Sequence, residues 1–149
     1  NRFSPKRIIL DRNLEINLKS YIAKSIKNEN TIIFHNSNDK SKIKLLKKRG
    51  AILIKRNTDK YKNLDLKKIL KDLYKMEIRN LLVEGGDILT KNFLQKKLFN
   101  EFYMFRSSKN LSKNKKHVNF TSFSILNTKY NKHKINSKLA TDKLTIYKN

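Results

Sequence analysis

Cysteine is absent from this chain of 149 residues, which excludes a disulfide framework and any zinc site built on cysteine ligands. No apolar run approaches the roughly 20 residues that a membrane-spanning helix needs, and the opening residues show no secretory signal pattern. These absences favour a cytoplasmic protein. The length suits one domain with a real hydrophobic core, since domains usually contain about 100–200 residues.

Acidic residues are scarce: 12 Asp and Glu stand against 36 Lys and Arg, for a net charge of +24. Such a charge indicates either a polyanionic partner such as nucleic acid or a compositional bias toward Lys, Asn and Ile. The lysines are spread along the whole chain, and no basic stretch carries the regularly interleaved aromatics of a base-stacking groove. We therefore favour the compositional explanation, although so basic a surface would still attract phosphorylated small molecules.

Glycine is also rare, and two of the three glycines are the adjacent pair Gly85-Gly86. The apolar run Leu81–Val83 before them is typical of a short buried strand ending at Glu84, and apolar residues recur at helical spacing over 88–94. Glycines let a ligand approach the backbone, and a helix start offers free N–H groups, so this order predicts a phosphate or nucleotide site. The alternative is an ordinary turn in which Asp87 caps the helix.

The remaining apolar runs predict alternating strands and helices. The predicted strands are Ile8–Leu10, Thr31–Phe34, Ala51–Ile54, Leu81–Val83 and Glu101–Phe105. The predicted helices are a poorly defined one within Leu14–Ile26 (Leu18, Tyr21, Ile22 and Ile26 facing inward), one through 43–46 ending at Gly50, an amphipathic one over Leu66–Tyr74 starting near Asp65, and one after Gly86. This alternation predicts an α/β fold, a mostly parallel sheet flanked by helices.

The C-terminal part follows a different pattern. Phe120, Phe123, Ile125 and Leu126 are apolar without a clear period. Two closing strands, Lys134–Lys138 and Leu144–Tyr147, have no helix between them and should pair antiparallel.

Few residues carry recognisable chemistry. There is no Walker loop, no His-Glu-x-x-His motif and no nucleophile elbow, and the three histidines lack metal-ligand spacing, so we expect no metal site. Asp11 and Glu84 are the acids at predicted strand ends. If those strands are parallel neighbours, both acids face one crevice where substrate and cofactor meet; the alternative is two unrelated surface acids.

Two segments resemble a known family. Ser4–Arg12, read as Ser-Pro-Lys-Arg-Ile-Ile-Leu-Asp-Arg, resembles the Pro-x-Arg-(apolar)₃-Asp segment in the reductase domain of the bifunctional riboflavin-biosynthesis deaminase/reductase. Val83–Gly86, the following helix and Phe99–Glu101 resemble its second hallmark block. The resemblance implies a dihydrofolate-reductase-like fold, a homodimer, and NADPH-dependent reduction of 5-amino-6-(5-phosphoribosylamino)uracil to its ribitylamino form.

The same resemblance implies roles for individual residues. Glu84 would contact the substrate, and we expect Glu84 and Asp11 to be the catalytic acids. Thr31–His35 would border the adenosine end of NADPH. The cofactor-binding residues would be Arg12, Gly85, Gly86, Asp87, Ile88, Leu89, Thr90, Lys91 and Asn92. A carboxylate at Glu84 could also favour the positive charge that develops on the sugar during hydride transfer.

The chain departs from the family pattern in three ways. The zinc deaminase domain is missing, and the opening part of the reductase domain would precede residue 1. Ser107–Ser112 replaces the usual Pro and Gly, and Asn100 replaces a common Asp. We therefore expect a C-terminal fragment of a longer enzyme, and such a fragment can lack activity alone. The alternatives are a related oxidoreductase acting on another pterin or pyrimidine, a basic nucleic-acid-binding module, and a non-catalytic scaffold domain.

Overall fold

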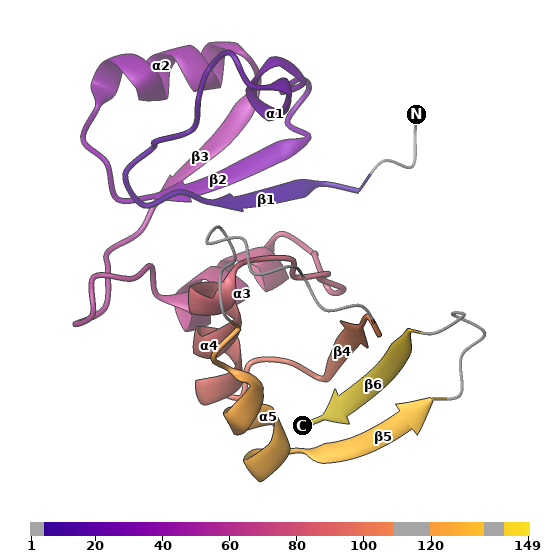
Figure 1. Cartoon of the computed structure of the whole chain (residues 1–149). Coiled ribbons are helices and arrows are strands. Elements are labelled where there is room, and N and C mark those ends of the chain that lie inside the picture. Colours follow the sequence, from indigo (N-terminus) through magenta and orange to yellow (C-terminus); the bar gives the residue numbers. More distant parts are fainter. Residues whose placement is uncertain (1–4, 109–119, 136–141) are drawn as a thin grey trace, which may run out of the picture. The chain divides into compact units, whose positions relative to one another are not determined.

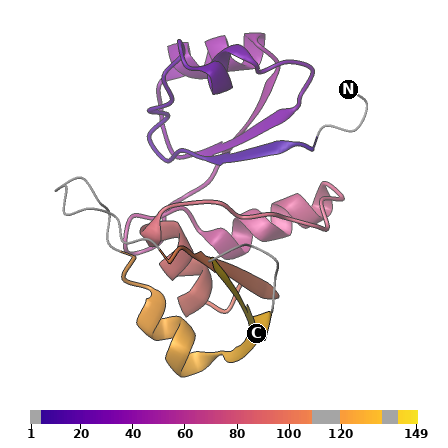
Figure 2. The ribbon, with the colours of Figure 1, turned by 45° about the vertical axis from the view of Figure 1, so that its right-hand side comes forward.

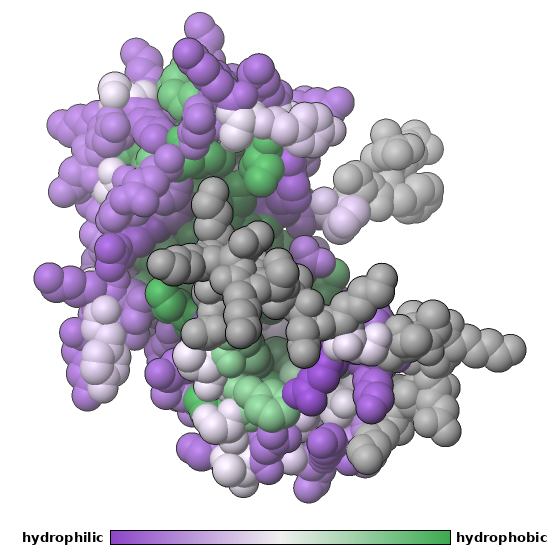
Figure 3. All heavy atoms as spheres, viewed as in Figure 1, coloured by the Kyte–Doolittle hydropathy of each residue, from purple (hydrophilic) through white to green (hydrophobic). Residues whose placement is uncertain are grey.

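The chain forms two compact units, Asn1–Asn80 and Leu81–Asn149 (Figure 1). This computed structural model describes residues 5–108, 120–135 and 142–149. Within the described residues, no helix is both long and apolar enough to cross a membrane. Figure 3 shows hydrophilic side chains over most of the visible surface of the first unit, as the spread of lysines along the sequence requires.

The first unit is built on a three-stranded parallel sheet. Its strands are β1 (Arg7–Leu10), β2 (Thr31–His35) and β3 (Ala51–Lys55), in the order β1-β2-β3. The register aligns Ile8 with Ile32 and Ile32 with Ile52. These strands confirm three of the predicted runs. Every residue of β2 is buried because it is the central strand, as expected of a parallel sheet covered on both faces.

Helices α1 (Tyr21–Lys24), α2 (Lys40–Lys48) and α3 (Leu66–Lys75) complete the first unit. Two of them start at aspartate caps: Asp39 Oδ1 accepts from the Lys42 amide at 2.9 Å, and Asp65 Oδ1 accepts from the Lys67 amide at 3.1 Å. The chain leaves α2 through Gly50, whose φ of +92° favours glycine. The predicted start of α3 and the predicted stop at Gly50 are therefore confirmed.

Helices cover both faces of the parallel sheet (Figure 1, Figure 2). Alternate residues of β2 point to opposite faces. One hydrophobic core contains Leu14, Ile26, Ile33, Leu46 and Ala51 and lies on the α2 side. The other contains Ile32, Phe34, Leu64, Ile69 and Leu73 and lies on the α3 side. The apolar stripe of α3 therefore packs in the core, as predicted for its buried residues. Tyr74, which was predicted to belong to this stripe, is exposed.

The second unit is an antiparallel sheet covered by two helices. Its elements are α4 (Asp87–Gln95), β4 (Glu101–Arg106), α5 (Phe123–Lys129), β5 (Asn131–Ile135) and β6 (Lys143–Lys148), with strand order β4-β6-β5. Leu94 of α4, Leu126 of α5 and Tyr147 of β6 form its core. The antiparallel C-terminal pair is confirmed, with β5 starting earlier than predicted; residues 136–138 of that prediction lie outside the described residues.

The predicted strand Leu81–Val83 is wrong. These residues belong to no strand, and Leu82 is 84% exposed. An apolar run becomes a strand only where a neighbouring strand takes its hydrogen bonds, and no described residue pairs with this one. The predicted strand Glu101–Phe105 exists as β4, but it pairs antiparallel with β6 instead of extending the parallel sheet.

One helix prediction needs correction, and one helix was not predicted. The region Leu14–Ile26 contains only the short α1. Ile26 lies in the core and Leu18 packs against it, as predicted, whereas Tyr21 and Ile22 are exposed. Helix α5 was missed in the sequence. Only Leu126 of α5 is buried, so the helix has no apolar stripe to reveal its period.

Candidate functional site

The glycine turn leads directly into α4. Gly86 is the N-cap, with φ −72° and ψ 176°, and the first intrahelical bond runs from the Thr90 amide to the Gly86 carbonyl at 3.1 Å. The helix therefore supplies no partner for the amides of its first turn, at residues 87–89. These donors stand at the positive end of the helix dipole, an arrangement suited to a phosphate group.

The two glycines of this turn have different surroundings. A Cβ added at Gly85 would lie 2.7 Å from Leu89 Cδ2, so a side chain there would displace Leu89. A Cβ added at Gly86 would meet no atom within 4 Å, and the φ of Gly86 is one that any residue adopts. The packing of the described residues thus gives no reason for glycine at 86. A ligand lying against the backbone would supply that reason.

Glu84, immediately before the turn, is exposed. Among the described residues, its carboxylate makes no hydrogen bond or ion pair. A carboxylate that no described residue engages is available to a ligand. The substrate contact of Glu84 stays a prediction.

Asp87 serves the protein's own structure. Its Oδ1 accepts hydrogen bonds from the Thr121 amide at 3.0 Å, the Ser122 amide at 3.1 Å and the Ser122 hydroxyl at 2.8 Å, and its Oδ2 accepts from the Thr121 hydroxyl. The side-chain hydrogen bonds from Thr121 and Ser122 lower the pKa of Asp87 below its usual value. Asp87 therefore ties α4 to the start of α5. It is not the cap of its own helix, which is Gly86.

Thr121 and Ser122 were not found in the sequence. They lie 34 and 35 residues from Asp87, and nothing local to either segment indicates that the two will meet.

The other predicted cofactor residues lie along α4. Ile88 is 74% exposed and Lys91 is exposed, whereas Leu89 and Thr90 are half-buried. The side-chain amide of Asn92 donates to the Ile88 carbonyl at 3.0 Å, within the same helix. The cofactor contacts predicted for these residues stay predictions.

In the first unit, Asp11 and Arg12 follow β1. Both Asp11 oxygens accept backbone N–H groups, Oδ1 from Glu15 at 2.8 Å and Oδ2 from Ile16 at 2.7 Å. The Arg12 side chain donates to the Asn13 side-chain oxygen at 3.1 Å and to the Lys62 carbonyl. Asp11 thus stabilises the loop after β1, and its catalytic role stays a prediction. Asp11 and Glu84 lie in different units, so their shared crevice stays a prediction too.

His35 ends the central strand and is almost completely buried. Burial is the main cause of its lowered pKa; the Ser37 backbone opposes the shift. No described group is placed to hydrogen-bond its Nδ1 atom. All five residues of Thr31–His35 are buried, and their predicted border with the adenosine end of NADPH stays a prediction. No group of three His, Asp or Glu residues in the described part of the chain could bind a metal ion.

The loops after the three parallel strands are linked to one another. The Asn36 amide donates to the Arg12 carbonyl at 2.7 Å, and the Arg56 amide donates to the His35 carbonyl at 2.8 Å. The Asn36 side chain donates to the Arg56 carbonyl at 2.8 Å. The carboxyl edge of the sheet, where ligands collect in open α/β folds, is therefore held in one arrangement.

Comparison with known proteins decides the family. The family model described as the RibD C-terminal domain matches residues 1–137. The chain belongs to the RibD C-terminal domain family. Riboflavin biosynthesis protein RibD of Aquifex aeolicus (strain VF5) is 34% identical over 105 residues, which are 70% of this chain and 28% of that protein. This RibD C-terminal domain therefore spans less than a third of that curated relative.

Solved structures show the fold of this RibD domain. Acinetobacter baumannii RibD, form 2, matches with a TM-score of 0.68 and 21% identity, covering 97% of this chain and 37% of that one. A pyrimidine reductase-like protein from Corynebacterium diphtheriae matches with a TM-score of 0.66 and 14% identity, covering 97% and 60%. The predicted dihydrofolate-reductase-like α/β fold is confirmed.

Proposed function

We propose that this domain catalyses the NADPH-dependent reduction of 5-amino-6-(5-phosphoribosylamino)uracil to its ribitylamino form. Membership of the RibD C-terminal domain family supports a reductase of riboflavin biosynthesis. The observation that carries the cofactor assignment is the open space at Gly86, beside the free amides of the first turn of α4. A dinucleotide pyrophosphate carries the negative charge that these amides can bind, and it needs no contact from a side chain at residue 86.

The chain's own residues have defined tasks in this reaction. NADPH, when bound, supplies the hydride. The first-turn amides of α4 would hold the pyrophosphate, and the exposed guanidinium of Arg12 would supply a cationic contact for the cofactor. Glu84 orients the substrate and favours the positive charge that develops on the ribosyl carbon receiving the hydride. Positioning of the two reactants supplies much of the rate enhancement.

We further propose that the described units are part of one reductase domain within a longer deaminase/reductase that works as a homodimer. The short coverage of the RibD relatives supports a longer polypeptide. The exposed apolar run Leu81–Val83, which no described residue pairs with, supports additional chain packing against it. The reading frame upstream of Asn1 tests the first proposal, and sedimentation of the full gene product tests the homodimer.

The reaction is tested with Glu84→Gln in the full gene product. We expect NADPH affinity within about twofold of wild type and a single-turnover rate of hydride transfer at least tenfold lower, because the amide keeps the shape and removes the charge. Glu77→Gln, another exposed acid, is the matched control and should change neither quantity. Full single-turnover hydride transfer in Glu84→Gln would refute the electrostatic role.

Cofactor identity is tested by competition and by salt. NADPH should bind more tightly than NADH and protect the amides of residues 85–90 from hydrogen exchange. A nucleic-acid-binding module would instead bind oligonucleotides with an affinity that falls steeply as salt is added. Oligonucleotide binding that weakens steeply with added salt, together with no protection of residues 85–90 by NADPH, would favour that alternative.

A further inference from the structure

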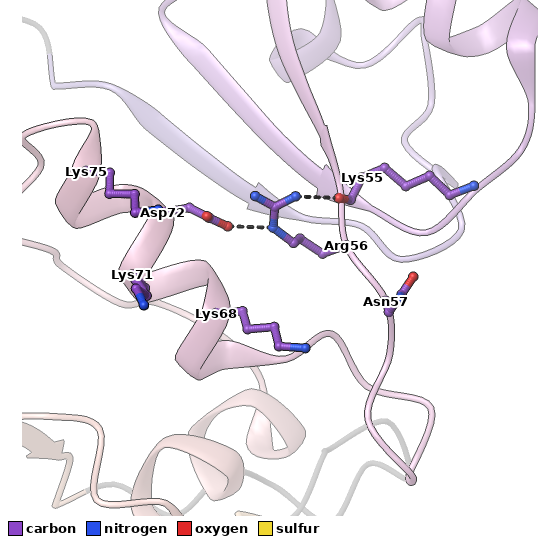
Figure 4. Close-up of a pocket in the computed structure, with 7 residues that line it drawn as sticks. All are labelled: Lys55, Arg56, Asn57, Lys68, Lys71, Asp72 and Lys75. Atoms are coloured by element: carbon purple, nitrogen blue, oxygen red, sulfur yellow. Dashed lines mark hydrogen bonds and ion pairs between the residues drawn. The ribbon is translucent and has the colours of Figure 1, made fainter.

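A cavity of about 400 Å³ lies beside the carboxyl end of β3, against the outer face of α3 (Figure 4). The residues that line it are Lys55, Arg56, Asn57, Lys68, Lys71, Asp72 and Lys75. The four from α3 recur at i, i+3, i+4 and i+7, which places them on one face of the helix. The opposite face carries the buried Leu66, Ile69 and Leu73. The cavity is therefore a feature of the first unit alone.

The lining is far more cationic than the chain as a whole. About a quarter of all residues are Lys or Arg, whereas five of the seven lining residues are. The single carboxylate of Asp72 leaves an excess of four positive charges around the hollow. A general lysine bias does not explain this local concentration, and so many like charges around one hollow favour occupation by an anion.

Two hydrogen bonds hold the guanidinium of Arg56 in place. Figure 4 shows its side chain reaching from the end of β3 toward Asp72 on α3. Nε donates to Asp72 Oδ2 at 2.6 Å, and Nη1 donates to the Lys55 carbonyl at 2.8 Å. The hydrogen bond raises the pKa of Arg56 and lowers the pKa of Asp72, so both stay charged. The guanidinium is thus oriented before any ligand arrives, which reduces the entropy cost of binding.

The lysines of the cavity differ in how far the protein already uses them. Lys68 Nζ lies 3.8 Å from Asp65 Oδ2, and Lys55 Nζ donates to the Asn38 side chain. Lys71 and Lys75 are exposed and, among the described residues, form no ion pair. They lie one helical turn apart on the same face. Because no described residue pairs with them, their ammonium groups are free to bind a ligand.

We propose that this cavity binds a phosphate or diphosphate group of a small molecule, with Arg56 as the oriented donor and Lys71 and Lys75 as the mobile cations. A dianion or trianion can accept hydrogen bonds from all three at once. The position also fits, since ligands gather at the carboxyl ends of parallel strands. This site goes beyond the proposed reductase reaction and does not depend on it.

The lining favours a small anion over nucleic acid. None of the seven lining residues is aromatic, and single-stranded nucleic acids are usually bound through bases stacked on aromatic side chains. The cavity volume lies in the range of about 300–1,000 Å³ typical of small-molecule sites. A phosphorylated metabolite is therefore the better match.

The proposal is tested with inorganic diphosphate as the probe, titrated into the protein by calorimetry at constant ionic strength. The test variant is the double substitution Lys71→Gln/Lys75→Gln. The matched control is Lys44→Gln/Lys48→Gln, which removes the same charge at the same i, i+4 spacing from exposed positions on α2. Thermal melting of both variants checks that the fold is retained.

We expect saturable binding of diphosphate to wild type, at least tenfold weaker binding to the Lys71/Lys75 variant, and a change below about twofold in the control. Arg56→Lys should also weaken binding, because lysine keeps the positive charge but lacks the planar set of N–H donors of a guanidinium. Equal losses in the two double variants would overturn the proposal, since diffuse charge would then explain the binding. Absence of saturable binding, or an RNA oligonucleotide that outcompetes diphosphate equally on all variants, would overturn it as well.

Discussion

Gly86→Ala is the substitution that best separates cofactor binding from folding. The backbone at Gly86 has φ −72° and ψ 176°, which alanine adopts without strain. The added methyl group would have no atom of the described residues within 4 Å. Reduced freedom of the unfolded chain stabilises such a variant by about 0.4–1 kcal/mol. Alanine is a poorer N-cap than glycine by roughly the same amount. The free energy of unfolding should therefore change by less than about 0.5 kcal/mol.

NADPH affinity should respond very differently. If the pyrophosphate lies against the first turn of α4, the methyl group stands between the phosphate oxygens and the amides that bind them. We expect the dissociation constant to rise at least tenfold, which corresponds to about 1.4 kcal/mol. Urea denaturation measures the stability, and titration of NADPH fluorescence measures the affinity.

Gly85→Ala provides the comparison. Its Cβ would lie 2.7 Å from Leu89 Cδ2, so this variant should lose stability, and the double variant Gly85→Ala/Leu89→Ala should lose less than the sum of the single changes. A fully folded Gly86→Ala protein with wild-type NADPH affinity would refute the reasoning, because the open space would then have no ligand to explain it.

Three further predictions concern stability. Gly50→Ala should cost about 1–3 kcal/mol in urea denaturation, because φ is +92° and the new Cβ would lie 3.0 Å from the Asn28 amide nitrogen; an unchanged midpoint would contradict this. Leu126→Ala should cost about 2–5 kcal/mol, since Leu126 is fully buried in the core of the second unit, and Leu126→Met should recover most of it. Burial lowers the pKa of His35 in the folded state, so the unfolded state binds the extra proton first and stability should fall as the pH drops below about 6.5. His35→Gln should flatten that part of the pH–stability curve, and identical slopes in both proteins would argue against it.

Much of the first unit could be predicted from local sequence. The runs that became β2 and β3 are short, apolar and β-rich, and the apolar stripe of α3 recurs at a clear helical period. Asp65 and Gly50 mark the start of α3 and the end of α2 through contacts within a few residues. Signals of this kind need no knowledge of the rest of the chain.

Only part of the candidate site could be predicted from local sequence. The order of acid, paired glycines and helix start is local, so the sequence indicated an anion-binding turn at Gly85-Gly86. Asp87 shows the limit of that reasoning. Its residue type suits a helix cap or a ligand contact equally, and only the folded chain brings Thr121 and Ser122 to its carboxylate.

The sequence by itself therefore determined the strands β1, β2 and β3, the end of α2, the start of α3 and the position of the glycine turn, because each depends on neighbours a few residues apart. Tertiary structure decided that Leu81–Val83 finds no strand partner among the described residues, that β4 pairs with β6, and that α3 and the end of β3 line a cationic cavity. These features depend on which distant segments lie together. Hydrogen-bond partners and charge clusters formed across the fold have no signature in a linear pattern.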